Sequence, residues 1–245
     1  MEKLITIENI VKKDSLGQPI LNGISAKVME GEFITIIGPS GSGKSTFLSL
    51  INRMTEPDSG LLRFKGTPYV EMDVLKLRRK IGMVFQLPTM LPGTVRDNLL
   101  IGLSPVPGNP EQCRNRRPIR PDCPPKINKR TGCPFPFGGQ KQRISLARSL
   151  ANRPEILLLD EVTASLDPTS TEEIEELIQR LHQNGTTILW VSHNLKQAKK
   201  VGEYTWVIAG GKIVEQGHPN EVFVNPKHVI TQEFIATSFG KEPVT

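Results

Sequence analysis

Residues 33–46 read FITIIGPSGSGKST, a short apolar run followed by a loop with three glycines and a lysine. The run FITII is typical of a strand that is buried on both faces of a sheet. The loop matches the pattern G-x-x-x-x-G-K-[ST], and the next residues, FLSLINRM, predict an apolar helix. A strand, a glycine loop and a helix in this order predict a phosphate-binding loop rather than an ordinary glycine-rich turn.

The chemistry of this loop follows from its residue types. Its glycines let the backbone wrap closely, so that N–H groups point at phosphate oxygens and the start of the helix adds partial positive charge. Lys44 is expected to reach the β- and γ-phosphates, and Ser45 to ligate Mg²⁺. The residues assigned to phosphate binding are Gly38, Pro39, Ser40, Gly41, Ser42, Gly43, Lys44, Ser45 and Thr46.

A second buried strand, within EILLLDE (155–161), ends in two acidic residues. Ligands of open α/β sheets bind at the carboxyl ends of the strands. Asp160 is therefore expected to hold Mg²⁺ through water, and Glu161 to polarise the attacking water. Two acids after a strand are a weak signal alone, but with the phosphate loop they predict a nucleoside triphosphatase.

Strand and helix patterns alternate along the chain, which predicts an α/β fold with a mostly parallel core sheet. The predicted strands are 4–10, 20–28, 33–37, 61–65, 81–85, 155–161, 186–193 and two more, joined by a Gly-Gly turn, in 204–217. The predicted helices are 47–54, 74–80, 94–102 with Thr94 as N-cap, 168–185, 195–201 and one or two in 219–240.

The segment 103–137 breaks this alternation. It holds nine of the chain's 20 prolines and has no period of 2 or 3.6, so a helix or strand is not expected there. Two explanations stay open: a genuine insertion, or a stretch of the gene that was read out of frame. The three cysteines, Cys113, Cys123 and Cys133, also lie here without a C-x-x-C pair, so surface thiols are favoured over a metal site.

The formal net charge of +6 could indicate nucleic-acid binding, but most of it comes from 103–137, with seven Lys or Arg against two acidic residues. The rest of the chain is close to neutral, which argues against a basic surface that binds the phosphate backbone of nucleic acids. No apolar run is long enough to cross a bilayer, and MEKLITIENI has no signal-peptide pattern. We expect a protein that stays in the cytoplasm and meets a membrane only through a partner.

Residues 138–167, GGQKQRISLARSLANRPEILLLDEVTASLD, narrow the class. They resemble the signature region of ATP-binding cassette (ABC) ATPases. In that family the signature is followed by the acidic strand end called Walker B and then by the D-loop. Gln86 after a predicted strand is similar to the Q-loop glutamine, Ser165–Asp167 to the D-loop, and His193 in LWVSHN to the switch histidine.

The resemblance implies a P-loop NTPase fold with an N-terminal antiparallel β-subdomain, a core in 1–86 and 153–245, and an inserted helical subdomain in 87–152. It implies that Gln86 senses Mg²⁺, that His193 contacts the γ-phosphate, and that two subunits enclose each ATP. The signature residues would face the ATP of the other subunit. The further nucleotide contacts implied by the resemblance are Gly138, Gly139, Gln140 and Asp167.

Four departures from the family pattern are visible. The signature reads Pro136-Phe137 where the family has Leu-Ser, so a hydroxyl donor to the γ-phosphate is missing. No aromatic residue precedes Phe33 to stack on adenine, so either this contact is absent or another residue such as Leu16 covers the base. Val162 stands where the family often has proline, and 103–137 does not resemble the helical lobe that normally meets the permease.

The predicted function is therefore the ATP-binding and ATP-hydrolysing subunit of an ABC transporter, peripheral on the inner face of the cell membrane. Its predicted cofactors are ATP and Mg²⁺, its partners a second such subunit and an integral membrane permease. The chain looks most like small bacterial cassettes of the phosphate-import and metal-ion-export type. The alternatives are a non-transport ABC ATPase, a P-loop kinase, and a cassette that binds ATP but turns over poorly.

Overall fold

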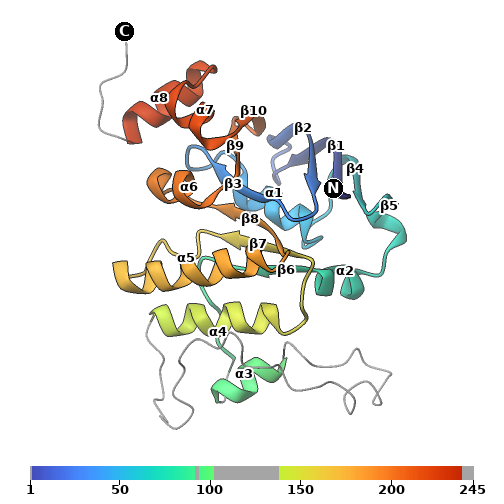
Figure 1. Ribbon diagram of the computed structural model, residues 1–245. Coiled ribbons are helices and arrows are strands. Elements are labelled where there is room, and N and C mark those ends of the chain that lie inside the picture. Colours follow the sequence, from blue (N-terminus) through green and yellow to red (C-terminus); the bar gives the residue numbers. More distant parts are fainter. Residues whose placement is uncertain (1, 92–93, 102–137, 239–245) are drawn as a thin grey trace.

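The computed structural model describes residues 2–91, 94–101 and 138–238 (Figure 1). The described residues form two sheets with helices between and around them. The segment 103–137, with the three cysteines and Pro136-Phe137, lies outside the described residues. Within the predicted subdomain 87–152, helices α3 and α4 are described.

The smaller sheet is antiparallel, in the order β2-β1-β4-β5. It comprises β1 (Lys3–Lys13), β2 (Pro19–Met29), β4 (Ser59–Phe64) and β5 (Thr67–Pro68), followed by the 3-10 turn η1 (Tyr69–Glu71). β1 and β2 extend beyond the predicted ranges 4–10 and 20–28, because their pairing continues through register shifts into more polar residues. This sheet is the N-terminal antiparallel subdomain implied by the family resemblance.

The larger sheet is mostly parallel, in the order β10-β9-β3-β8-β7-β6. Only the hairpin strand β10 runs antiparallel within it. Its strands are β3 (Phe33–Ile37), β6 (Ile81–Val84), β7 (Ile156–Asp160), β8 (Thr187–Val191), β9 (Tyr204–Ala209) and β10 (Lys212–Gly217). β3, β7 and β8 are buried along their whole length, as continuous apolar runs predict.

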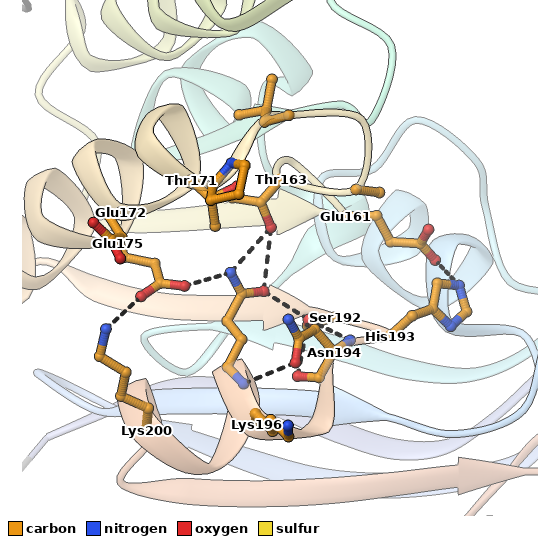
Figure 2. A pocket seen from close by; sticks show the side chains of 14 residues that line it. Glu161, Thr163, Thr171, Glu172, Glu175, Ser192, His193, Asn194, Lys196 and Lys200 are labelled. Atoms are coloured by element: carbon orange, nitrogen blue, oxygen red, sulfur yellow. Dashed lines mark hydrogen bonds and ion pairs between the residues drawn. The ribbon is translucent and has the colours of Figure 1, made fainter. Parts of the chain in front are cut away.

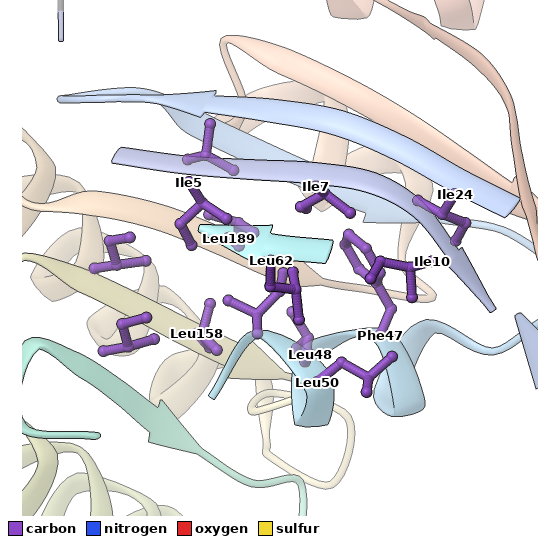
Figure 3. Packing of buried hydrophobic residues seen from close by; sticks show 14 of the residues in the cluster. Ile5, Ile7, Ile10, Ile24, Phe47, Leu48, Leu50, Leu62, Leu158 and Leu189 are labelled. Atoms are coloured by element: carbon purple, nitrogen blue, oxygen red, sulfur yellow. The ribbon is translucent and has the colours of Figure 1, made fainter. Parts of the chain in front are cut away.

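Helix α1 (Lys44–Ile51) packs between the two sheets. Phe47 and Leu48 meet Ile7 of β1 and Leu189 of β8 in one apolar cluster (Figure 3). Each of these fully buried side chains contributes about 1.5–3 kcal/mol. The cluster therefore holds the start of α1, and the loop before it, in a fixed position.

The limits of α1 differ from the prediction of 47–54. The helix begins at Lys44, directly after Gly43. It ends early because Arg53 takes a left-handed conformation with φ of 55°. The Met54 N–H then bonds the Ser49 carbonyl and the Arg53 N–H bonds the Leu50 carbonyl, which is a Schellman motif.

The other face of the larger sheet is covered by α5, with α4 and α3 beyond it (Figure 1). These helices are α3 (Val95–Ile101), α4 (Gly138–Leu150) and α5 (Pro168–Gln183). Thr94 caps α3 as predicted, since its hydroxyl accepts from the Asp97 N–H and Asp97 accepts from the Thr94 N–H in return.

The remaining helices are α2 (Val74–Lys80), α6 (Leu195–Val201), α7 (Pro219–Val224) and α8 (Val229–Ser238). The C-terminal part forms two helices because Pro226 follows α7 and prevents its continuation. None of the described helices combines the length and apolar character that a membrane crossing requires.

Candidate functional site

The phosphate-binding loop lies between β3 and α1, pressed against neighbouring backbone. A Cβ on Gly38 would come within 2.0 Å of the Ile208 carbonyl oxygen, and one on Gly43 within 2.9 Å of the Ile20 carbonyl oxygen. The φ angles are 144° at Gly38, 75° at Gly41 and 100° at Gly43, values that side chains other than glycine rarely adopt. Glycine is therefore required at 38 and 43 by contact as well as by backbone conformation.

Lys44 is the buried cation of this loop. Its side chain is folded onto the loop itself, with the Nζ donating to the carbonyl oxygens of Gly38 at 2.8 Å and Pro39 at 2.7 Å. Burial lowers the pKa of the ammonium group, and the nearby Glu161 and Asp160 carboxylates oppose that shift. Within the described part of the chain, the buried hydroxyl of Ser42 has no hydrogen-bond partner. A buried ammonium, an unpaired hydroxyl and a helix N-terminus together fit a phosphate group.

Ser45 and Asp160 meet at the carboxyl end of β7. The Ser45 hydroxyl donates to Asp160 Oδ1 at 3.0 Å. Burial is the main cause that raises the pKa of Asp160, while the Ser45 hydrogen bond opposes the shift. Mg²⁺ is usually held by one or two carboxylates plus substrate phosphates and water, so these two oxygens beside the phosphate loop fit that ion. The described residues contain no group of three or more His, Cys, Asp or Glu that could hold a metal by themselves.

Glu161 and His193 form a close pair at the same edge of the sheet. Glu161 Oε1 lies 2.5 Å from His193 Nε2. Glu161 follows β7 with a φ of 48°, and its N–H bonds the Val191 carbonyl at the end of β8. Because β7 and β8 are parallel neighbours, their carboxyl ends bring the two side chains together. The strained conformation of Glu161 is of the kind that is common at active sites.

A shallow cleft of about 380 Å³ adjoins the loop, between the β1–β2 turn and the β9–β10 turn. It is lined by Asp14, Gln18, Pro19, Ile20, Pro39, Ser40, Gly41, Ser42, Gly210 and Gly211. No aromatic side chain is among these residues. Leu16 stands at the tip of the β1–β2 turn, 83% exposed, with its N–H held by the Asp14 carboxylate at 2.8 Å.

Residues 21–164 match the ABC transporter family. The chain belongs to that family. It is 40% identical over 240 residues to ABC transporter I family member 17 of Arabidopsis thaliana, covering 97% of this chain and 90% of the relative. It is 38% identical over 256 residues to the phosphate import ATP-binding protein PstB 2 of Lactobacillus johnsonii, covering 98% of this chain and 100% of the relative.

Among solved structures, the chain resembles the ATP-binding cassette MJ0796, in a dimeric post-hydrolysis state bound to ADP and Pi. The TM-score is 0.70 at 28% identity, covering 88% of this chain and 99% of the other. These similarities confirm the predicted ABC ATPase fold and the predicted family of ATP-binding transporter subunits, including the likeness to phosphate importers.

The residues that the ABC resemblance assigned to the signature lie away from this edge. Gly138 and Gly139 open α4, and Gln140 is exposed. A Cβ on Gly139 would lie 2.7 Å from the Ser170 hydroxyl, which places the start of α4 against the start of α5. The structure therefore does not bring these residues to the chain's own phosphate loop.

Asp167 caps a helix, and Gln86 follows β6, whose carboxyl end lies beside that of β7. Asp167 is the N-cap of α5, where its carboxylate accepts from the Ser170 N–H at 2.9 Å, and these hydrogen bonds lower its pKa. Gln86 is exposed just after β6. Val162 is buried in the apolar cluster with Leu146 and Ile174, so valine serves there as a packing residue.

Two buried glutamines, Gln142 and Gln197, were not identified from the sequence. Each contacts a segment that belongs to an ABC motif. Gln142 of α4 is buried and donates to the Phe85 carbonyl at 3.0 Å, which fixes the helix to the residue before Gln86. Ser149 on the same face donates to the Met83 carbonyl. The spacing of Gln142, Leu146 and Ser149 along one helix face was the available signal. The second residue, Gln197, is buried and accepts a hydrogen bond from Ser192, the residue before His193.

Proposed function

We propose that this chain binds ATP with Mg²⁺ and hydrolyses it as the ATP-binding subunit of an ABC transporter. The observation that carries the proposal is the convergence of three elements at one sheet edge: the loop with buried Lys44, the Ser45–Asp160 pair, and the Glu161–His193 pair. Membership of the ABC transporter family supports it.

The phosphate loop offers its own groups to the nucleotide. Lys44 exchanges the carbonyls of Gly38 and Pro39 for phosphate oxygens, and the unpaired Ser42 hydroxyl is free to donate. Ser45 and Asp160 hold Mg²⁺, which neutralises phosphate charge when it is bound. No large rearrangement of α1 is needed, because its apolar face is already packed between the sheets.

Glu161 orients the attacking water and accepts its proton. Its side chain is only 12% exposed, so it holds the water in a partly desolvated site. His193 is 43% exposed and contacts the same carboxylate, so part of its ring stays accessible for a contact with the γ-phosphate. The base of the nucleotide lies in the cleft beside Leu16.

The nucleotide site is completed by a second copy of the chain. Gly139 lies against α5 rather than the chain's own loop, so the N-terminus of α4 is available to ATP on a partner. The related cassette MJ0796 is a dimer in its ADP-bound structure, which supports this arrangement. The subunit attaches to the inner face of the cell membrane through an integral permease, without nucleic acid as a partner.

We further propose that turnover is reduced by the signature. Phe137 has no hydroxyl to donate where the family has serine. The loss of one such donor costs about 10²–10³ in rate in other enzymes.

The test compares ATPase rates of the wild type, Lys44→Ala, Glu161→Gln and the double variant Pro136→Leu, Phe137→Ser. We expect the wild type to bind ATP–Mg²⁺ tightly and to hydrolyse it slowly. Hydrolysis should be lost in Lys44→Ala and in Glu161→Gln, and it should be faster in the double variant. Fast wild-type hydrolysis, or no gain in the double variant, contradicts the reduced-turnover proposal. Absence of ATP binding contradicts the function itself.

A second experiment separates a transporter subunit from a non-transport ABC ATPase. Affinity purification of the tagged chain from its native cells is expected to recover an integral membrane protein with several spans. Recovery of ribosomes or DNA instead would contradict the transporter role and favour the alternative.

A further inference from the structure

A buried polar cluster lies directly behind the Glu161–His193 pair. We call it the Gln197 cluster; its members are Thr163, Glu175, Ser192 and Gln197. Glu175, Ser192 and Gln197 are 6%, 4% and 3% exposed. They line a cleft of about 670 Å³ between α5 and α6, and Glu161 and His193 line the same cleft (Figure 2).

Gln197 bonds to both loops that carry the pair. Its Oε1 accepts from the Ser192 hydroxyl at 2.7 Å, and its Nε2 donates to the Thr163 hydroxyl at 3.0 Å. Ser192 directly precedes His193, and Thr163 is two residues beyond Glu161. One side chain thus spans the gap between the two catalytic loops.

Glu175 fixes the direction of the Gln197 amide. Its Oε1 accepts from Gln197 Nε2 at 2.8 Å, and its Oε2 accepts from Lys200 Nζ at 2.8 Å. A carboxylate paired with an ammonium group can only accept, so the amide nitrogen of Gln197 must face it. The amide oxygen then faces Ser192, whose hydroxyl has to be the donor.

The fixed orientation of the Ser192 hydroxyl also fixes the backbone of the loop that carries His193. Because its proton points to Gln197, its oxygen is free to accept from the Asn194 N–H at 3.0 Å. The Asn194 side chain in turn accepts from the Gln197 N–H at 3.1 Å. The residues on both sides of His193 are therefore anchored to Gln197.

We infer that Gln197 is a positioning residue for ATP hydrolysis, holding the loop of His193 against the segment after Glu161. This inference rests on the proposed ATPase function. The contrasting reading is that the Gln197 cluster only stabilises the fold. The two differ in whether loss of Gln197 acts through His193.

The test uses Gln197→Met, which keeps the side-chain volume and removes every hydrogen bond of the amide group. We expect kcat to fall about 10- to 100-fold, the cost of a small misplacement of catalytic groups. KM for ATP should change less than twofold, because Lys44 and Ser45 are untouched. In a His193→Ala background, Gln197→Met should cost less than twofold further. A purely structural role would instead give equal additional losses in both backgrounds.

The exchange variant Gln197→Glu with Glu175→Gln controls for folding. It swaps donor and acceptor between the two positions, so Ser192 still donates to position 197, and the amide introduced at position 175 donates to the carboxylate introduced at 197. We expect kcat within threefold of the wild type, whereas Gln197→Glu alone places two carboxylates together and should be strongly impaired. Failure of the exchange variant to recover, in a protein that melts like the wild type, would overturn the inference.

A second readout does not need activity. The NMR signals of the His193 imidazole, assigned with His193→Ala, should shift in Gln197→Met and stay unchanged in Lys199→Ala, an exposed control on the same helix. If the wild type hydrolyses ATP no faster than Lys44→Ala, the proposed function fails. The NMR measurement then still tests whether Gln197 positions His193. Unshifted His193 signals, or unchanged kcat in an active protein, would reject the role of Gln197.

Discussion

The replacement of Gly38 by alanine tests the geometry of the phosphate loop most directly. An alanine Cβ would lie 2.0 Å from the Ile208 carbonyl oxygen, in strand β9. Non-bonded carbon and oxygen atoms approach to about 3.3 Å, so loop and strand must separate by about 1.3 Å. The φ angle of 144° adds strain that only glycine escapes.

The cost can be worked out from these two terms. Backbone strain of this kind costs about 1–3 kcal/mol, and forcing extra volume into a packed site costs about 1–3 kcal/mol. The free energy of unfolding should therefore fall by roughly 2–6 kcal/mol. For a domain of this size that corresponds to a melting temperature lower by roughly 5–20 °C. A displaced loop should also bind ATP more weakly, because its N–H groups no longer meet the phosphate oxygens.

The matched control is Gly185→Ala. Gly185 also has a positive φ, of 89°, but a Cβ there meets nothing within 4 Å. Only the backbone term applies, about 1–2 kcal/mol, and nucleotide affinity should be unchanged because Gly185 lies after α5. Thermal unfolding and equilibrium binding of a fluorescent ATP analogue measure both effects. If Gly38→Ala behaved like Gly185→Ala in stability and affinity, the contact argument for the loop would be refuted.

Three further perturbations give distinct results. Burial raises the pKa of Asp160, so its ionised form destabilises the fold at neutral pH and the penalty disappears as the pH falls through the folded-state pKa. Without Mg²⁺, Asp160→Asn should therefore resist urea better than the wild type at pH 7 and lose that advantage towards pH 4; a pH-independent difference would contradict this. Leu16→Tyr should tighten ATP binding about two- to tenfold by stacking on the base, measured by titration calorimetry, and unchanged affinity would place the base elsewhere. Thr94→Ala should destabilise α3 by about 1 kcal/mol, seen as faster amide exchange in that helix only, and uniform exchange across the chain would argue against a local cap.

Much of the fold could be predicted because its signals are local. The strand ranges 33–37 and 81–85, the helix 74–80 and the Thr94 cap follow from short periodicities and capping residues, and the structure agrees within a residue or two. The early end of α1 could not be predicted, because the left-handed Arg53 gives no sequence signal of the kind that glycine gives.

The polar residues inside the core were harder to find. Gln142 and Gln197 look like solvent-facing residues in their helices, since glutamine is common on helix surfaces. Their burial depends on which elements pack over them: the end of β6 for Gln142, and α5 with the Ser192 loop for Gln197. Periodicity places Gln142 on one helix face with Leu146 and Ser149, but it does not say which element packs over that face.

The sequence by itself determined the phosphate loop, the acidic end of β7 and the family of the chain, because each is a contiguous motif with its own local structure. Only the tertiary structure decided which side chains meet. Ser45 reaches Asp160, and Glu161 reaches His193, because β8 lies between β3 and β7 and all three strands end at one edge. Strand order is set by the packing of the whole sheet between its helices, and that is a property of residues far apart in the chain.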